Sequence, residues 1–301
     1  QMGSRGKADR LDLFHGTNFK MRTTGRYGGV VTIYDLWLDR HPEYSTKLLG
    51  QRFSFFRTRR TARRARKVIT ISNNSAHDLQ ELYGLPLDHI RVVTVGVSSE
   101  FSVDVDPNQV KALKSRLQIS ERPYVLFVGG ADPRKNHRTL VRAFARCRQE
   151  IKDHVLVLVG DAVHRFGNYS DSVRAEGLED SVRCPGRVSA EDLRLLYSGA
   201  AVFVFPSLYE GFGIPVLEAM ASGTPVITSD STSLPEVAGD AAMLVNPESP
   251  DQLKAALVRV LEDEDLRQSL RAKGLERVKS FTWERTARQT FAVYREVVGQ
   301  G

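Results

Sequence analysis

Two adjacent cations, Arg134 and Lys135, follow the sequence VGGAD at the end of an apolar run. The glycines Gly129 and Gly130 in this run allow a ligand to approach the backbone closely, and two cations can neutralise a diphosphate. Cations at the start of a helix oppose its dipole, which indicates that they serve another purpose. The alternative is a glycine turn followed by solvated charges, and the segment by itself leaves both interpretations open.

A second group of chemistry-bearing residues lies in the segment PSLYEGFGIPVLE, residues 206–218. The backbone N–H groups of residues 211–213 precede a helix that has Pro215 in its first turn, and such a helix start binds anions. Glu210 on the loop and Glu218 in the helix are spaced so that both carboxylates can face one cavity. Glu218 can accept hydrogen bonds from ribose hydroxyls.

The alternative makes Glu210 a surface residue and Glu218 a favourable charge in the first helical turn. The apolar stretch IPVLEAMA around Glu218 counts against this alternative. It is typical of a buried helix, in which a carboxylate without a partner is costly.

The elements that position these residues alternate between strands and helices from Pro123 onward. The strand candidates are short and β-branched, and several end in Gly, Pro, Ser or Asp, as buried parallel strands do. They are residues 124–130, 154–161, 182–188, 200–207, 224–230 and 241–247. Helical patterns lie between them, which predicts βαβ units and a doubly wound parallel α/β sheet.

Residues 1–97 predict part of a second α/β domain. Strands are expected at 11–16, 30–36, 67–72 and 90–97, and helices at 45–67 and 75–84. About four strands are fewer than a full nucleotide-binding half contains, so we expect this domain to be incomplete. We expect its sheet edge to leave the apolar side chains of residues 30–36 partly uncovered, which favours a homo-oligomer formed through this domain.

Residues 98–282 are expected to form the other domain, which begins with an interdomain linker over 98–109. A last helix in residues 283–301 follows a break at Ser280–Thr282. This helix is free to pack anywhere, including back on the first domain.

The composition excludes several classes of protein. The chain has 301 residues, of which 41% are hydrophobic and 26% charged, values typical of a globular protein of about two domains. No apolar run reaches the roughly 18–20 residues that cross a bilayer, and the first ten residues lack the apolar stretch of a signal peptide. The two cysteines, Cys147 and Cys184, cannot form a disulfide framework. We therefore expect a cytoplasmic protein.

The excess positive charge lies in the first third of the chain. Residues 1–97 carry 17 Lys or Arg against 8 Asp or Glu, and residues 52–67 alone carry eight basic residues. This asymmetry predicts an anionic partner.

The basic helix, residues 45–67, has Leu49, Phe53 and Phe56 at helical spacing. These side chains are interpreted either as a stripe that packs in the core or as part of a surface that docks on an anionic membrane. No nucleic-acid-binding motif accompanies the charge, so nucleic acid is not expected as a partner.

In an ordered series of motifs the chain resembles the retaining family-4 glycosyltransferases, which have the GT-B fold. The motifs are FVGGADPRKN, PGRVSAEDLRLLYSGA, FPSLYEGFGIPVLEAMASGTPVITSD and FTWERTA, and EGFGIPVLE is similar to the family's glutamate–seven–glutamate motif. The resemblance covers roughly residues 11–297. The most similar subgroup is the bacterial mannosyltransferase-type enzymes of surface polysaccharide assembly. The resemblance implies two Rossmann-like domains. They are an acceptor-side domain over residues 1–97, which is shortened here, and a domain over residues 98–282 that binds the nucleotide-sugar donor.

The resemblance also implies roles for single residues. Lys135 matches the lysine that binds the donor diphosphate, and Arg134 is its partner because Gly130 occupies the position usual for an arginine. Glu218 matches the glutamate that holds the donor ribose, and Glu210 the one that contacts the donor sugar. Glu210, Arg134 and Lys135 are thereby implied as catalytic. The remaining donor-binding positions are Gly129, Gly130, Arg187, Val188, Ser207, Gly211, Phe212, Gly213, Ile214 and Leu217.

The implied reaction transfers a sugar with retention from a nucleotide-diphosphate sugar, GDP-mannose first and a UDP-sugar second, to a saccharide or lipid-linked acceptor. A nucleoside diphosphate is a good leaving group, so clamping its charge replaces protonation by a general acid. No D-x-D carboxylate pair is placed to hold Mg²⁺, and we expect neither a metal nor a cofactor. The alternative is a non-catalytic module that binds a nucleotide sugar or an anionic surface.

On the acceptor side the chain departs from the family pattern. Tyr34-Asp35 stands where many members have His-Asp. Tyrosine forms hydrogen bonds, but its ordinary pKa near 10 makes proton transfer an unlikely role. His15, in the segment FHGTNF, is expected either as a further acceptor-side residue or as a plain turn histidine.

Overall fold

The computed structural model describes residues 11–21, 28–44, 48–119, 121–164 and 167–299. The chain forms two compact units. The first unit contains residues 1–96, 210–212 and 281–301, and the second unit contains residues 97–209 and 213–280.

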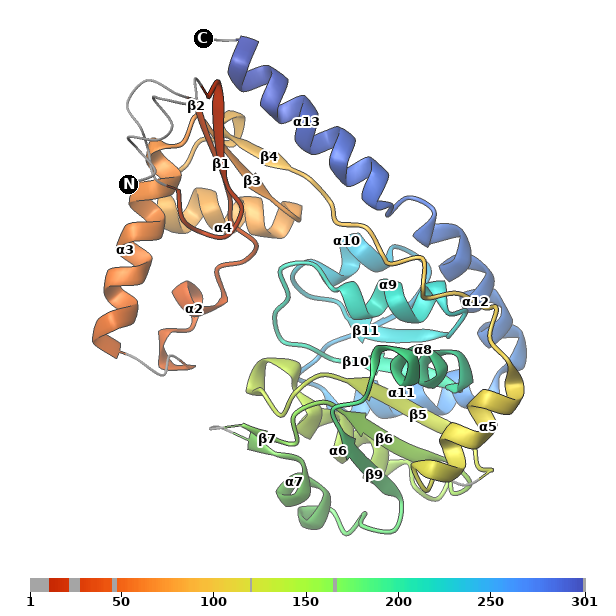
Figure 1. Ribbon diagram of the computed structural model, residues 1–301. Helices are drawn as coiled ribbons and strands as arrows, with labels where there is room; N and C mark the ends of the chain where they lie inside the picture. Colours follow the sequence, from red (N-terminus) through yellow and green to blue (C-terminus); the bar gives the residue numbers. More distant parts are fainter. Residues whose placement is uncertain (1–10, 22–27, 45–47, 120, 165–166, 300–301) are drawn as a thin grey trace. The chain divides into compact units, whose positions relative to one another are not determined.

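The sheet of the second unit has six parallel strands (Figure 1). In spatial order they are β12 (Met243–Val245), β11 (Val226–Ser229), β10 (Val202–Phe205), β5 (Tyr124–Val128), β6 (Val155–Val159) and β9 (Val182–Gly186). Each one lies inside a strand that the sequence predicts, so these predictions are confirmed. All five side chains of β6 are buried although they alternate between the two faces, so both faces are covered.

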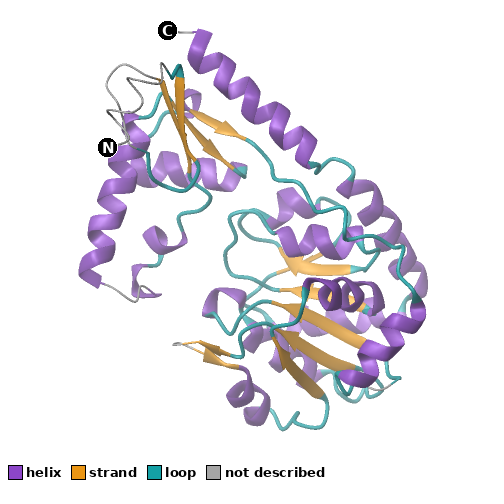
Figure 2. Ribbon diagram, in the orientation of Figure 1, coloured by secondary structure: helices purple, strands orange, loops and turns teal. Residues whose placement is uncertain are grey.

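Helices lie on both faces of this sheet (Figure 2). They are α5 (Pro107–Arg116), α6 (His137–Arg146), α7 (Tyr169–Ala175), α8 (Ala190–Gly199), α9 (Ile214–Ala221), α10 (Leu234–Ala238), α11 (Pro250–Glu262) and α12 (Glu264–Val278). A short hairpin pairs β7 (Val163–His164) with β8 (Gly167–Asn168). The core includes Phe127, Leu140, Phe144 and Leu257, whose side chains are fully buried. Burying each of them stabilises the fold by about 1.5–3 kcal/mol.

The predicted linker over 98–109 is wrong at its end, because helix α5 begins at Pro107. The Asp106 side chain accepts a hydrogen bond from the Asn108 N–H group at 2.9 Å and caps this helix. Proline in the first turn suits a helix start, so the D-P pair begins an element here.

The order of the strands places the switch point of the second sheet between β5 and β10. From β5 the chain builds β6 and β9 on one side of β5, then returns to build β10, β11 and β12 on the other. In open parallel sheets, ligands bind outside the carboxyl ends of the strands at such a point.

The sheet of the first unit has four parallel strands in the described residues. They follow one another in space as β1 (Leu13–Gly16), β2 (Gly28–Thr32), β3 (Lys67–Thr70) and β4 (Ile90–Val92). Three predicted strands extend too far, because β2 ends at Thr32, β3 at Thr70 and β4 at Val92. After β2 the Asp35 carboxylate accepts a hydrogen bond from the Trp37 N–H group at 3.1 Å, which turns the chain into helix α2 (Trp37–Arg40).

Further helices cover this sheet. Apart from the 3₁₀ turns η1 (Pro42–Tyr44) and η2 (Leu87–His89), they are α3 (Leu48–Arg64), α4 (Asn73–Tyr83) and α13 (Trp283–Gly299). The predicted basic helix over 45–67 is therefore shorter: Lys67 already belongs to β3, and residues 45–47 lie outside the described residues.

Helix α13 packs on the sheet of the first unit. Val293 and Val297 are buried in one apolar cluster with Val30 of β2 and Ile69 of β3. Glu296 on the same helix binds the Lys67 ammonium group at 3.0 Å. The last helix thus belongs to the unit that contains the beginning of the chain.

The expectation that residues 30–36 leave apolar side chains uncovered is wrong. Val30, Val31 and Ile33 are fully buried, and Leu36 is 1% exposed. The reason is that β2 lies between β1 and β3, with α13 on one face and a cluster built from α3 and α4 on the other.

Candidate functional site

Arg134 and Lys135 lie on a 3₁₀ turn, η3 (Pro133–Lys135), that follows β5. The Asp132 carboxylate accepts a hydrogen bond from the Arg134 N–H group at 2.9 Å and fixes the start of the turn. The Lys135 ammonium group lies 5.0 Å from the centre of the Phe205 ring at the end of β10, a cation–π distance. Both cations are half-buried. The two sequence motifs therefore meet at the switch point of the sheet.

Hydrogen bonds tie this turn to the segments that follow β10 and β12. Asn136 adopts a left-handed conformation, with φ of 57°. Its side-chain amide donates to the carbonyl oxygen of Pro206 at 3.0 Å and to that of Pro247 at 2.7 Å. The Leu208 N–H group donates to the carbonyl oxygen of Arg134 at 2.8 Å. The two cations thus belong to a positioned turn, which favours the diphosphate interpretation over that of solvated charges.

Gly129 and Gly130, which precede the turn, have no side chains and so leave space beside the backbone. A β-carbon added at Gly129 would lie 3.3 Å from the Lys135 Cγ atom, whereas one at Gly130 would meet no other atom closer than 3.8 Å. The Gly129 carbonyl accepts a hydrogen bond from the buried Tyr169 hydroxyl. A ligand can therefore approach the backbone closely at Gly130.

Ser207, directly after β10, is buried with a side-chain oxygen that has no hydrogen-bond partner among the described residues. The Ser207 carbonyl oxygen accepts from the Ser229 hydroxyl of β11 at 2.7 Å, so the backbone is held in place. An unsatisfied buried hydroxyl costs about 1–3 kcal/mol, which a ligand that forms hydrogen bonds would recover. Its position beside the Lys135 turn fits the donor-binding role that the resemblance implies.

Helix α9 begins after Gly213, whose φ of 115° is rarely adopted by residues with a side chain. A β-carbon there would also lie 2.7 Å from Leu234. Of the next two predicted positions, Ile214 is 39% exposed and Leu217 is fully buried. The Leu217 side chain therefore belongs to the core.

Glu218 in α9 is half-buried and accepts a hydrogen bond from the Tyr197 hydroxyl at 3.0 Å. Burial raises the pKa of Glu218, and the hydrogen bond from Tyr197 partly offsets this rise. Tyr197 is itself fully buried in α8. The carboxylate is thus held in position by one hydrogen bond, which partly offsets the cost of burying it in an apolar helix.

The glutamate–seven–glutamate motif is divided between the two units. Glu210, Gly211 and Phe212 group with the first unit, and the residues from Gly213 to Glu218 with the second. Glu210 is 7% exposed. Whether the two carboxylates face one cavity stays a prediction.

Arg187 and Val188 follow β9, two strands away from β5. The Arg187 guanidinium forms two hydrogen bonds to the Asp161 carboxylate, of 2.5 and 2.6 Å, and holds the pKa of that carboxyl below its usual value. Arg187 is 80% exposed, and an exposed pair of this kind adds little stability. The guanidinium is therefore accessible to a ligand at this edge of the sheet.

On the acceptor side, His15 lies in strand β1 and is not a turn residue. Its Nδ1 atom lies 2.6 Å from the Tyr294 hydroxyl of α13, and its Nε2 atom lies 2.8 Å from the Thr32 hydroxyl of β2. Burial lowers the pKa of His15, so the ring is neutral at pH 7. Both ring nitrogens are thus engaged within the first unit.

Tyr34 and Asp35 follow β2. The Tyr34 hydroxyl donates to the Thr17 carbonyl oxygen at 2.8 Å, which joins the loops after β1 and β2. Asp35 turns the chain into α2 and also lines a cavity of the first unit. Of the three predicted acceptor-side residues, Asp35 alone borders this cavity.

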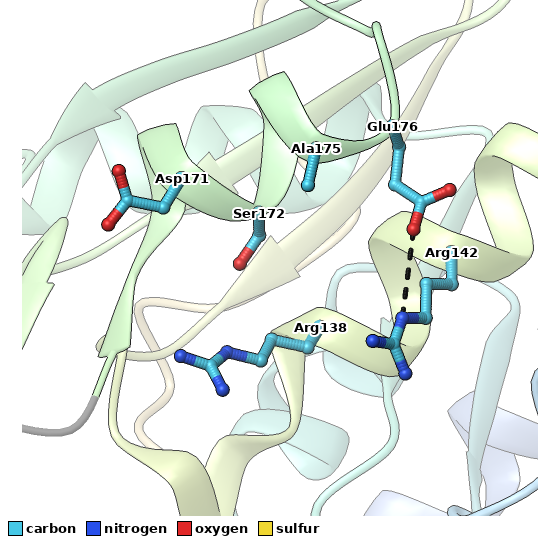
Figure 3. Close-up of a pocket in the computed structure, with 6 residues that line it drawn as sticks. All are labelled: Arg138, Arg142, Asp171, Ser172, Ala175 and Glu176. Carbon is cyan, nitrogen blue, oxygen red and sulfur yellow. Dashed lines mark ion pairs between the residues drawn. The ribbon is translucent and has the colours of Figure 1, made fainter.

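The second unit contains a separate cavity of about 200 Å³ between α6 and α7 (Figure 3). The six residues that line it are Arg138, Arg142, Asp171, Ser172, Ala175 and Glu176, and the sequence predicts none of them as a donor position. Its charges balance, and the Arg142 guanidinium lies 3.6 Å from the Glu176 carboxylate. We therefore assign no ligand to this cavity.

The described part of the basic helix buries Thr58, Ala62 and Ala65 and exposes Phe56 to 62%. Assigning Phe56 to a core stripe is therefore wrong, whereas the side chains of Leu49 and Phe53 lie outside the described residues. Five arginines on this part of the helix are also exposed: Arg57, Arg59, Arg60, Arg63 and Arg64.

None of the helices formed by the described residues is long and apolar enough to cross a membrane. In the same part of the chain, no three His, Cys, Asp or Glu side chains lie close enough together to hold a metal ion.

Comparison with known proteins identifies the family. The family model described as "Glycosyl transferases group 1" matches residues 109–277, and "Glycosyltransferase Family 4" matches residues 4–101. The chain is a group 1 glycosyltransferase. This glycosyltransferase is 32% identical to the O-antigen chain mannosyltransferase B of Escherichia coli, over 94% of its own length and 74% of that protein. It is 33% identical to the MMP alpha-(1->4)-mannosyltransferase of Mycolicibacterium hassiacum, over 80% of its own length and 57% of the relative.

Solved structures agree with this family. The sucrose-phosphate synthase of Thermosynechococcus elongatus superposes on the glycosyltransferase with a TM-score of 0.81 at 26% identity, over 100% of this chain and 77% of the other. Anabaena HepE in complex with UDP and glucose gives a TM-score of 0.80 at 20% identity, over 98% and 81% of the two chains. The predicted GT-B-type fold is confirmed.

Sequence analysis missed several residues beside the candidate donor site of this glycosyltransferase. Tyr197 lies in an apolar helical pattern, and nothing in that pattern indicates that its hydroxyl donates a hydrogen bond to Glu218. After β11, the Ser231 hydroxyl is buried without a partner among the described residues. Thr232 next to it has a φ of 56°, a strained conformation for a β-branched residue that often marks functional loops. The polar run SDSTS after a strand was the available signal.

Proposed function

We propose that this glycosyltransferase transfers mannose from GDP-mannose to a saccharide or lipid-linked acceptor in surface polysaccharide assembly, with retention and without a metal ion. Support for mannose comes from relatives named mannosyltransferases at 32% and 33% identity. A UDP-sugar is the alternative donor, since a fold neighbour was solved with UDP and glucose.

The observation that carries the proposal is the positioned Lys135 turn at the switch point of the second sheet. Arg134 and Lys135 supply positive charge where the leaving diphosphate gathers negative charge, and the Ser207 hydroxyl beside them still needs a hydrogen-bond partner. Groups fixed in advance stabilise a developing charge without reorganisation. This clamp takes the place of a general acid and of a metal ion.

Other residues are assigned to the remaining parts of the donor. Glu218, oriented by Tyr197, accepts hydrogen bonds from the ribose hydroxyls. Arg187 at the end of β9 contacts the base, and Glu210 contacts the transferred sugar.

A calorimetric screen of GDP- and UDP-sugars tests the donor. We expect GDP-mannose to bind at least tenfold more tightly than UDP-glucose or UDP-mannose. Tighter binding of a UDP-sugar would assign that sugar as the donor in place of GDP-mannose. Failure of all nucleotide sugars to bind would refute the proposal.

Product analysis tests retention and metal independence. We expect an α-linked product by NMR, and a rate unchanged by EDTA. A β-linked product would contradict retention, and loss of activity with rescue by Mg²⁺ or Mn²⁺ would contradict the clamp.

A second proposal concerns helix α3, which we assign to docking on the anionic cytoplasmic face of a membrane, where lipid-linked acceptors lie. Its support is the exposed Phe56 among exposed arginines, an apolar anchor surrounded by positive charge. Binding to phosphatidylglycerol vesicles should fall steeply with salt and weaken in Phe56→Ser. The matched control is Phe291→Ser, because Phe291 is 60% exposed on α13. Equal loss in both variants, or binding that salt does not weaken, would overturn this assignment.

A further inference from the structure

The loop that carries Glu210 groups with the first unit over residues 210–212, although the residues on both sides of it in the sequence belong to the second unit. Glu210 is 7% exposed and Phe212 is 4% exposed. The Phe212 ring packs edge-on against the ring of Phe281, another residue of the first unit, with centres 5.8 Å apart. The first unit therefore holds this short loop.

Gly211, in the middle of the loop, lies against the backbone that follows β2. A β-carbon added at Gly211 would lie 2.7 Å from the Tyr34 carbonyl oxygen and 2.8 Å from the Asp35 Cβ atom. Real β-carbons essentially never make contacts this short, so a side chain here would force the loop or its neighbour to shift. Glycine is needed at this position for the close approach of two backbone segments.

Ser75 provides a hydrogen-bond donor at this approach. It lies in the first turn of α4 and is 1% exposed. Its hydroxyl donates to the Tyr34 carbonyl oxygen at 3.0 Å, and the Gly211 carbonyl oxygen lies 3.5 Å from the same Oγ atom. Because a serine hydroxyl has a single hydrogen, these two carbonyl groups share one donor.

Ser72 fixes the direction of the Ser75 hydroxyl. Ser72 is the N-cap of α4, and its Oγ atom accepts a hydrogen bond from the Ser75 N–H group at 3.0 Å. The Ser72 hydroxyl in turn donates to the Ser75 Oγ atom, also at 3.0 Å. Since Ser75 Oγ already accepts this bond, its own proton is left for the two carbonyl groups.

The position of the Gly211 backbone determines that of the preceding side chain. Glu210 and Gly211 are joined by one peptide bond, so a shift of the Gly211 backbone moves the Glu210 carboxylate with it. Displacement of a substrate-positioning group by about 1 Å can lower a rate on the order of 100-fold. A single hydroxyl that fixes this backbone can therefore affect the reaction without contacting the substrate.

We propose that Ser75 is a positioning residue for Glu210. Its hydroxyl holds the Gly211 backbone against the residues after β2, and in this way sets the place of the Glu210 carboxylate for the transferred sugar. The inference rests on the proposed function, in which Glu210 contacts that sugar. Ser75 acts through the loop and makes no contact with the donor.

Hydrogen exchange on the full chain, without donor, tests whether Ser75 holds the loop. In Ser75→Ala the amides of residues 209–213 should exchange about fivefold faster or more, because the loop opens more often, whereas those of β5 should exchange as before. The matched control is Ser249→Ala, which removes a serine hydroxyl from the N-cap of α11 and should leave the loop unaltered. Unchanged exchange of the loop in Ser75→Ala, or equal acceleration in the control, would overturn the proposal.

Calorimetry with GDP and GDP-mannose tests whether Ser75 acts through Glu210. Ser75→Ala should weaken GDP-mannose binding about fivefold and leave GDP binding unchanged, because GDP lacks the sugar. Glu210→Gln should show the same selectivity. Ser75→Ala added to Glu210→Gln should cause little further loss, because both substitutions disturb one contact. Additive losses in the double variant, or equal losses for GDP and GDP-mannose in Ser75→Ala, would overturn the proposal.

Gly211→Ala keeps the test decisive if Ser75→Ala does not fold stably. This variant retains the Ser75 hydroxyl and displaces the loop through the added β-carbon. It should also speed exchange of the loop and weaken GDP-mannose binding more than GDP binding, and the absence of both effects would count against the proposal.

The two measurements separate this inference from the proposed function. If a UDP-sugar proves to be the donor, the same comparison is made between that sugar and UDP. Absence of nucleotide-sugar binding in the unmodified chain would refute the proposed function, while the exchange of residues 209–213 still decides whether Ser75 holds the loop.

Discussion

Polar residues lie near the carboxyl ends of strands in both units, but the two units differ in whether these residues have hydrogen-bond partners. In the second unit the Ser207 hydroxyl after β10 is buried without a partner among the described residues, beside the Lys135 turn. In the first unit His15 binds Thr32 and Tyr294 through its two ring nitrogens. A buried polar residue at a strand end is therefore a stronger candidate ligand group where the fold leaves its atoms unsatisfied.

The source of the difference is the last helix. Tyr294, which engages His15, lies 279 residues away from it in the sequence, and α13 brings it onto the sheet of the first unit. The Ser207 hydroxyl after β10 has no such partner among the described residues, so it can still form a hydrogen bond. Substitutions in each of the two units test this difference.

The largest effect is expected for Lys135→Ala. Loss of one charged hydrogen bond to the diphosphate should weaken GDP-mannose binding by about 1.5–3 kcal/mol, roughly 10–150-fold. Binding of guanosine, which lacks the diphosphate, should stay the same. Isothermal calorimetry measures both ligands.

The matched control is Lys152→Ala, an exposed lysine of the same unit. It should leave both affinities unchanged. Equal losses in the two lysine variants would show that overall charge, and not the positioned turn, attracts the donor.

His15→Ala should change stability and leave donor binding unaltered. Removal of the imidazole leaves the Thr32 and Tyr294 hydroxyls without this partner, at a cost of about 2 kcal/mol. Because burial lowers the pKa of His15 in the folded state, its stabilising contribution is present above the ordinary value of 6.5 and is lost as the pH falls below it. The variant should therefore lose part of the acid sensitivity in urea unfolding.

His77→Ala removes an exposed histidine of α4 and should change neither quantity. If His15→Ala instead weakened acceptor binding with no loss of stability, His15 would be an acceptor-side residue after all.

Glu218→Gln should weaken GDP binding by about 1.5 kcal/mol, near tenfold, because the charged acceptor for the ribose hydroxyls becomes a neutral amide. With 2′-deoxy-GDP the same substitution should cost less. Calorimetry of the unmodified protein and of Glu218→Gln, each with GDP and with 2′-deoxy-GDP, isolates the ribose contact. An identical loss for both nucleotides would place Glu218 away from the 2′-hydroxyl.

The smallest effect is expected for the stability of Asp39→Asn. The pKa of Asp39 is about 6 in the folded state against an ordinary 3.8, so between these values the folded state binds more protons than the unfolded state. Stability from this group therefore falls as the pH rises from 4 to 6. The asparagine variant should lack this fall and be about 1 kcal/mol more stable at pH 7, after allowance for solvent screening.

Calorimetric unfolding between pH 4 and 7 measures this difference. The control is Asp88→Asn, the same change at an exposed aspartate of the first unit, which should leave the pH dependence unaltered. Lower stability at pH 7 would contradict the desolvated state of this carboxylate.

Much of the fold was predictable from the sequence, because short apolar runs such as VLVLV (155–159) and VFVF (202–205) are typical of buried parallel strands. The ends of the strands in the first unit were less predictable. Residues 33–36 continue the apolar pattern of β2, yet β2 ends at Thr32, and the Asp35 carboxylate accepts a hydrogen bond at the start of α2. Phe56 was equally ambiguous, since helical spacing does not say which face meets the core.

The sequence by itself determined the order of strands and helices along the chain, because each buried strand is written in a few adjacent apolar residues. The position of β10 beside β5, which brings the Lys135 and Ser207 segments together, was decided by the tertiary structure. Only the tertiary structure decided which polar groups near the strands are already satisfied. Hydrogen-bond satisfaction and desolvation depend on neighbours that are distant in the chain. For this reason the sequence could not show that both ring nitrogens of His15 have partners, or that Asp39, in no recognisable motif, is a partly buried carboxylate that lines a cavity.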